Sequence, residues 1–178
     1  MNRLFQFKLQ DKYLKLYNDA ISDIKTSTND LLIELDNLIN NYNKNNRFEH
    51  TFFLYEKSDV EKIEYLKKLR DKIILMNDCD KIKVKVATAF HPMCWAYLLS
   101  KKYPTHEWIK NYIMYGFCVP FYIHRPLMLA YYMFDLEYWE FRMLLAHELT
   151  HALLHTKDLN AETADDAIND AWTLCYLF

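Results

Sequence analysis

The chain contains one glycine, Gly116, among its 178 residues. Tight turns with positive φ angles and loops that cradle phosphate groups depend on glycine, because glycine has no β-carbon. The sequence therefore excludes a P-loop, a dinucleotide-binding fingerprint and any fold built on glycine turns. A length typical of one domain and a hydrophobic share of 52% predict a single domain over residues 1–178 with a sizeable core.

The charge pattern argues against nucleic acid as a partner. The formal net charge is −2, and the lysines are mixed with acidic residues rather than gathered in a basic stripe. The N-terminal sequence has no apolar signal region, and the longest apolar run is interrupted by His124, Arg125 and two prolines. We therefore expect a cytoplasmic protein with no nucleic-acid or membrane partner. Free thiols are expected at Cys79, Cys94, Cys118 and Cys175.

Hydrophobic periodicity predicts an N-terminal helical segment over residues 1–46, in which Asn29 or Asp30 can cap a second helical stretch. The Asn-rich residues 40–47 are the best linker candidate, because they are polar and show no apolar period. Residues 47–178 would then form the core that carries the chemistry.

Strand and helix patterns alternate in the rest of the chain. In "KIKVKVATAF" the period of two predicts a strand with Ile82, Val84 and Val86 facing inward. The other predicted elements are a strand at Thr51–Tyr55, an amphipathic helix with Val60, Ile63, Leu66, Leu69 and Ile73 on one face, a short helix from Thr105 to about Tyr115, one or two strands within 116–134, a long helix from Asp135 and a last helix from about Ala161. The predicted class is α+β, with a small mixed sheet between helices.

The long predicted helix carries the pattern H-E-x-x-H as His147, Glu148 and His151. Residues four apart lie one above the other on a helix face, so both imidazoles can reach one zinc ion. Glu148 lies about 100° further round the helix, beside the position of a metal-bound water. The flanking residues are apolar nearly all round, so this helix is expected to be buried, where histidine and glutamate need partners.

A third ligand has to come from outside this motif. His155 lies about 12 Å along the helix from His147, whereas two ligands of one zinc lie within about 3.5 Å. His155 therefore suits the negative end of the helix dipole better than the metal. The remaining candidates are the carboxylates of Asp158, Glu162, Asp165, Asp166 and Asp170.

The stretch from His147 through "HTKD" resembles the aspzincin metallopeptidases, which include deuterolysins and peptidyl-lysine endopeptidases. In that family a G-T-x-D turn supplies an aspartate to zinc, and Thr156 and Asp158 match its T and D. The resemblance implies a zincin-like fold, an active-site helix, a C-terminal helix and zinc bound by His147, His151 and Asp158. His155 stands where the family has glycine, and the tyrosine expected further on is missing.

Two rival patterns name other ligands. "HELTHA" followed by "AINDA" is similar to thermolysin-type gluzincins, and that alignment makes Asp170 the ligand. The helix also resembles that of the ImmA/IrrE peptidases, for which Asp165 or Asp166 would serve. Either reading implies a regulatory protease.

The expected function is a zinc-dependent metallopeptidase that acts on a protein or peptide, with Glu148 as general base. The substrate would lie along a sheet edge, at Phe121 to His124 or at Leu129 to Phe134. The alternatives are a zincin-fold regulatory or binding module without turnover, or an effector protease delivered by a signal-independent route. An effector would have a cognate inhibitor or immunity protein.

Overall fold

The computed structural model describes residues 6–9, 11–117 and 126–178. Its sheet is mixed, with the strand order β1 (Gln6–Lys8), β2 (Val84–Ala87), β4 (Leu127–Ala130), β3 (Gly116–Phe117). Strands β2 and β4 are parallel, while β1 and β3 pair antiparallel on the outside. The predicted α+β class with a small mixed sheet is confirmed.

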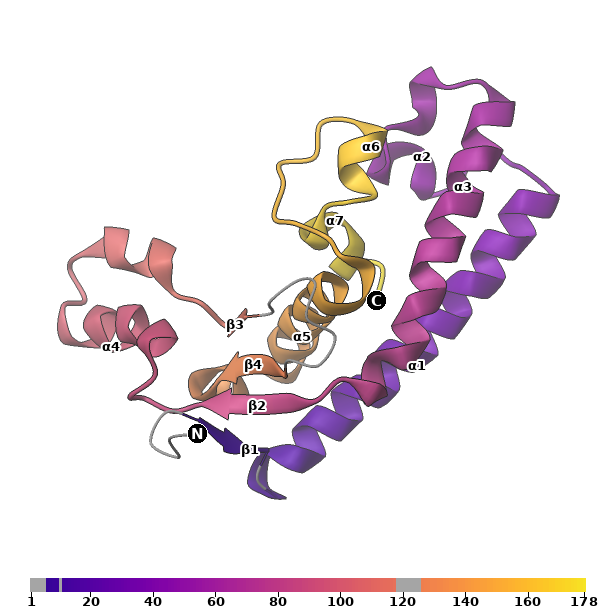
Figure 1. Cartoon of the computed structure of the whole chain (residues 1–178). Coiled ribbons are helices and arrows are strands. Elements are labelled where there is room, and N and C mark those ends of the chain that lie inside the picture. Colours follow the sequence, from indigo (N-terminus) through magenta and orange to yellow (C-terminus); the bar gives the residue numbers. More distant parts are fainter. Residues whose placement is uncertain (1–5, 10, 118–125) are drawn as a thin grey trace.

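A long helical pair extends from this sheet (Figure 1). Helix α1 (Asp11–Asn40) is continuous, and α3 (Asp59–Ile73) packs against it. The expected second helix start at Asn29 or Asp30 is wrong. Both residues lie inside α1, because the buried stripe continues through Thr28, whose hydroxyl donates to the Ile24 carbonyl at 2.7 Å. The linker predicted at 40–47 corresponds to the connection between α1 and the next helix.

The strand predicted at Thr51–Tyr55 is wrong. This region forms α2 (Phe48–Thr51) and a 3₁₀ helix (Leu54–Glu56). Phe48 and Phe52 are both buried, and their spacing of four residues suits a helical turn rather than a strand. The helix predicted next is α3, which Ser58 caps through a capping box with Glu61.

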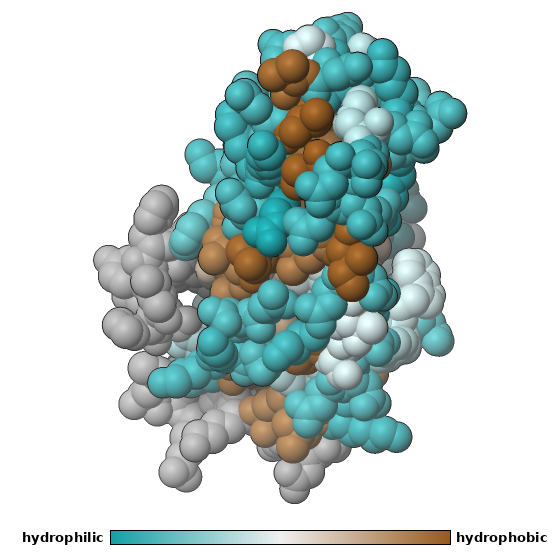
Figure 2. All heavy atoms as spheres, turned by 90° about the vertical axis from the view of Figure 1, so that its right-hand side faces the viewer, coloured by the Kyte–Doolittle hydropathy of each residue, from teal (hydrophilic) through white to brown (hydrophobic). Residues whose placement is uncertain are grey.

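The buried face of α3 was predicted correctly except at its first residue, Val60. Leu66, Leu69 and Ile73 are buried as expected, but Val60 is exposed because it lies about 180° round the helix from Leu69; Lys62 is the buried residue of the first turn. Figure 2 shows the surface on the side where α1 and α3 lie. This surface is largely hydrophilic and is crossed by a narrow hydrophobic strip.

The region between β2 and β3 holds a helix that the sequence patterns did not indicate. Helix α4 (Trp95–Lys102) follows a 3₁₀ turn (Pro92–Cys94). A 3₁₀ helix (Glu107–Tyr112) takes the place of the predicted helix at 105–115. The proposed sheet edge at Leu129 to Phe134 is also wrong, because β4 is an inner strand and Tyr131–Asp135 is a 3₁₀ helix. The other proposed edge, Phe121 to His124, lies outside the described residues.

Helix α5 (Tyr138–Leu154) is the long helix predicted from Asp135, and it begins three residues later behind Glu137, which caps it. It is buried on most sides and lies in the main hydrophobic core with residues of α1, α3, β2 and β4. The predicted last helix is two short ones, α6 (Ala164–Ala167) and α7 (Ala171–Cys175).

Three predicted free thiols, Cys79, Cys94 and Cys175, are free and buried, while Cys118 lies outside the described residues. Among the described helices, none combines the length and the apolar character that crossing a membrane requires.

Candidate metal centre

Two histidines of α5 face each other across one helical turn. The Nε2 atoms of His147 and His151 are 3.1 Å apart, and the two rings meet edge to face. His147 is buried and His151 is half-buried. The i, i+4 spacing therefore brings two imidazole nitrogens to one point, as the sequence pattern predicts.

A reversal of the chain brings in the third group. Helix α5 ends at Leu154, and His155 takes the left-handed conformation with φ of 54°. The aspzincins, which this stretch resembles, have glycine at this position, and a left-handed residue is common just after the end of a helix. After the reversal, Asp158 Oδ1 lies 3.1 Å from His147 Nε2 and 3.4 Å from His151 Nε2.

These three atoms have the spacing of ligands around one small cation. Tetrahedral bonds of about 2.0–2.1 Å place neighbouring ligand atoms about 3.3 Å apart, and the observed separations are 3.1, 3.1 and 3.4 Å. His147, His151 and Asp158 are the group among the described residues that could hold a metal ion. The Asp158 side chain is 65% exposed, so one side of the site is open to solvent.

The turn after α5 also orients His151. Its Nδ1 donates to the Thr156 carbonyl at 3.0 Å. A carbonyl can only accept, so in the neutral ring the proton is on Nδ1 and the lone pair is on Nε2, facing the other two groups. The buried Thr156 hydroxyl meets that of Thr150 at 3.1 Å, which ties the turn back to the helix.

Asp170 anchors the segment that carries Asp158. Its carboxylate accepts a hydrogen bond from Leu159 N at 2.9 Å and caps α7 by accepting from Thr173 N at 2.8 Å. Lys157 N donates to Asn169 O, and Ala171 N donates to Lys157 O, both at 2.9 Å. The backbone is therefore held on both sides of Asp158, and Asp170 is a buried structural acid outside the cluster.

The other candidate acids lie apart from the cluster. Asp165 is exposed, and Asp166 accepts a hydrogen bond from the Thr163 hydroxyl at the start of α6. The exposed Glu162 is also outside the cluster. Of the proposed third ligands, the structure brings only Asp158 to the two histidines within its described residues.

His147 is held by packing against an aromatic ring. The Trp172 ring centre lies 4.1 Å from that of His147, whereas His147 Nδ1 is buried without a hydrogen-bond partner among the described residues. Burial, and then the neighbouring His151, lower the pKa of His147 to about 4, against the opposing effect of Asp158. The imidazole is therefore neutral near pH 7, which is the form that binds metals.

The side chain of Glu148, a residue of α5, lies against the edge strand β3. A β-carbon added to Gly116 would overlap the Glu148 side chain, so this close approach requires glycine. Burial, and then the charge of Asp158, raise the pKa of Glu148 to about 8. The motif identified Glu148, but it did not indicate Gly116, for which the rarity of glycine was the only available signal.

The remaining histidines take no part in the cluster. His155 is exposed at the end of α5. His50 lies in α2, His91 caps a 3₁₀ turn and His106 precedes another, while His124 lies outside the described residues.

Comparison of the chain with protein-family models, curated proteins and solved structures gave no match.

The cluster predicts which substitutions remove metal binding. We expect the purified protein to bind about one metal ion per chain, measured by elemental analysis and by titration with Zn²⁺. His147→Ala, His151→Ala and Asp158→Ala should each weaken binding by at least 10- to 100-fold.

His155→Ala and Asp165→Ala are matched controls, because they remove the same kinds of side chain outside the cluster. Both should bind like the parent protein. Parent-like binding by Asp158→Ala together with loss in an Asp165, Asp166 or Asp170 variant would instead select one of the rival ligand sets.

The raised pKa of Glu148 predicts how the metal-free protein responds to pH. The folded state holds this proton up to about pH 8, whereas an unfolded chain releases it near the ordinary value of 4.5. Raising the pH through this window therefore destabilises the folded state, by on the order of 3 kcal/mol at pH 7. Glu148→Gln lacks this penalty.

Urea denaturation in the presence of a chelator measures the effect. The stability advantage of Glu148→Gln over the parent should be small at pH 5 and should grow steadily to pH 8. The lowered pKa of His147 has the opposite effect, because it makes the stability of the folded state rise with pH below the ordinary value of 6.5. Both proteins contain His147, so this effect cancels in the difference between their stabilities. An advantage independent of pH contradicts the assignment of a buried, protonated Glu148.

Proposed function

We propose that the chain is a zinc metallopeptidase of the aspzincin type. The observation that carries this proposal is the convergence of His147, His151 and Asp158 within 3.1–3.4 Å, on the helix that also carries Glu148. The order of these residues along the chain and the left-handed turn at His155 support the aspzincin alternative over the two rivals.

The donor set favours zinc over the common hard cations. Magnesium and calcium prefer shells made wholly of oxygen ligands, whereas two imidazoles and one carboxylate suit zinc. Three protein ligands with an open side are typical of catalytic zinc sites, while structural sites are closed by a fourth side chain. The exposed Asp158 side chain leaves that side open.

Bound zinc supplies a Lewis acid that polarises the scissile carbonyl and a water molecule. Glu148 follows His147 directly and accepts the proton of the attacking water, then delivers it to the leaving amine. With zinc held by His147, His151 and Asp158, the added positive charge would favour the ionised form of Glu148 and so oppose the effect of burial on its pKa. The hydrogen bond from His151 Nδ1 to the Thr156 carbonyl keeps the Nε2 of that ring directed toward the site.

The substrate is a peptide segment that lies along β3. This strand is the outer strand of the sheet next to the site, and its Gly116 is in van der Waals reach of Glu148. An extended peptide can add to such an edge through backbone hydrogen bonds. A cleft of about 840 Å³ opens beside Trp172 and Tyr176, and it can receive a side chain of the substrate.

A zincin-like binding module without turnover is the alternative that uses the same metal site. Glu148→Gln separates the two functions, because it keeps the size of the side chain and removes the proton acceptor. We expect this variant to bind zinc like the parent and to lose about 10²- to 10⁴-fold or more of the peptidase activity.

Activity is measured without a presumed substrate, by incubating the zinc-loaded protein with a proteome-derived peptide mixture and identifying new termini by mass spectrometry. Cleavage that requires zinc and disappears in Glu148→Gln is the expected result. Equal cleavage by both proteins, or none by the fully zinc-loaded parent, contradicts the proposal.

Gly116→Ala tests the contact between β3 and the general base. The added methyl group overlaps Glu148 and should displace it, at a cost of about 1–3 kcal/mol in stability. Because no ligand is touched, we expect unchanged zinc affinity and a reduced kcat. Zinc affinity that falls in parallel with kcat would show that the substitution disturbs the whole site.

A further inference from the structure

Residues 92–115 form an arm between β2 and β3 that extends away from the sheet (Figure 1). Its inner side is firmly attached. Met93 and Cys94 are buried against the sheet, and the Tyr97 ring stacks on Tyr132 with centres 3.9 Å apart. The arm is therefore held in place, and the exposure of its outer side is not explained by loose packing.

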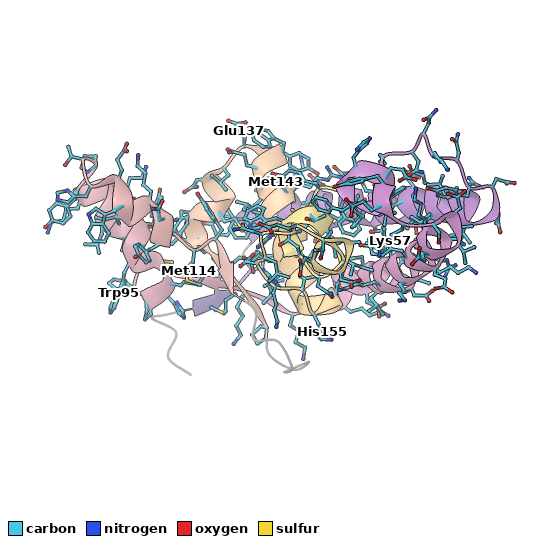
Figure 3. The ribbon with its side chains drawn as sticks, turned by 90° about the horizontal axis from the view of Figure 1, so that it is seen from above. Lys57, Trp95, Met114, Glu137, Met143 and His155 are labelled. Carbon is cyan, nitrogen blue, oxygen red and sulfur yellow. The ribbon has the colours of Figure 1, made fainter. Side chains whose placement is uncertain are left out.

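Large apolar side chains cover the outer side of the arm. Trp95 is 57% exposed, and Leu98 and Leu99, at helical spacing from it, are also exposed. Beyond α4, Trp108 and Tyr112 are 62% and 67% exposed, and their rings contact each other edge to face. Figure 3 shows the labelled Trp95 and Met114 on this arm, at the opposite end of the molecule from Lys57.

The arm also has the opposite charge from the chain as a whole. It contains Lys101, Lys102 and Lys110 against the single acid Glu107, so its formal net charge is +2 in a chain of −2. The nitrogens of Lys101 and Lys102 lie 5.3 and 5.4 Å from the ring centres of Tyr97 and Tyr103. Positive charge and aromatic surface are therefore interleaved.

We propose that this arm binds the surface of a bilayer containing anionic phospholipids. Tryptophan and tyrosine rings favour the boundary between lipid headgroups and acyl chains, and nearby lysines are attracted to the negative surface. A protein partner is less favoured by this composition. Protein interfaces are enriched in arginine and depleted in lysine, whereas the arm has three lysines and no arginine.

The expectation of no membrane partner rested on the absence of a spanning segment. Surface binding needs no such segment, because side chains insert only to the depth of the headgroups. The proposal is independent of the metal site, and its test does not involve peptidase activity.

The experiment is co-sedimentation of the full chain with two kinds of vesicle, pure phosphatidylcholine and phosphatidylcholine with about 30% phosphatidylserine. We expect binding to the anionic vesicles that weakens as salt rises from about 0.1 to about 0.5 M. Trp95→Ala combined with Trp108→Ala should lower the partition coefficient at least about tenfold. Lys101→Ala combined with Lys102→Ala should lower it by about fivefold per lysine.

Matched controls exist elsewhere in the chain. Trp139, on the first turn of α5, is 63% exposed, and Lys67 and Lys68 are exposed on α3. Trp139→Ala and Lys67→Ala with Lys68→Ala should bind like the parent. Two results overturn the proposal: no binding to anionic vesicles, or equal losses in arm and control variants. A dimer in sedimentation velocity that the Trp95/Trp108 variant abolishes also overturns it, because a second copy then covers the arm.

Discussion

Two imidazole nitrogens and one carboxylate oxygen meet at the end of α5, and holding these three atoms together is the requirement that the surrounding structure meets. His147 Nε2, His151 Nε2 and Asp158 Oδ1 are 3.1–3.4 Å apart. Such atoms approach closely when a proton or a cation lies between them. The Thr156 carbonyl accepts a hydrogen bond from His151 Nδ1, which leaves the facing Nε2 of that ring as an acceptor. The spacing suits a shared proton or a metal ion at the centre of the three atoms, and a metal ion is what we propose.

Several parts of the chain that are distant in sequence hold these three atoms in place. Burial of α5 in the core fixes the two imidazoles, and the left-handed His155 turns the chain back. In the segment after His155, the backbone of Lys157 forms hydrogen bonds with Asn169 and Ala171. Leu159 N donates a further hydrogen bond to the Asp170 carboxylate. On the opposite side, β3 approaches Glu148 closely enough to require glycine. Residues 159–171 thus help to position the site although none of them belongs to the cluster of His147, His151 and Asp158.

Local patterns predicted the elements that depend on local chemistry. Helical periodicity predicted α3 and α5, and the alternation of apolar and polar residues predicted β2. The H-E-x-x-H spacing predicted two histidines on one face of α5. Features set by tertiary packing were missed or wrong. The 51–55 region is helical because Phe48 and Phe52 pack together, and Val60 is exposed because it faces away from the buried side of α3. The roles of Gly116 and Asp170 depend on partners that lie 32 and 11 residues away in sequence, so no local pattern could reveal them.

X-ray absorption at the zinc edge reports which atoms surround the metal and therefore tests the ligand set of His147, His151 and Asp158. We expect four-coordinate zinc with two imidazole nitrogens at about 2.0–2.1 Å, oxygen donors at about 2.0–2.2 Å and no sulfur. Asp158→Ala should change the oxygen contribution and leave the imidazole signal. A spectrum with sulfur ligands, with one imidazole or with three, or one that Asp158→Ala leaves unchanged, would contradict the assignment of His147, His151 and Asp158 as the metal ligands.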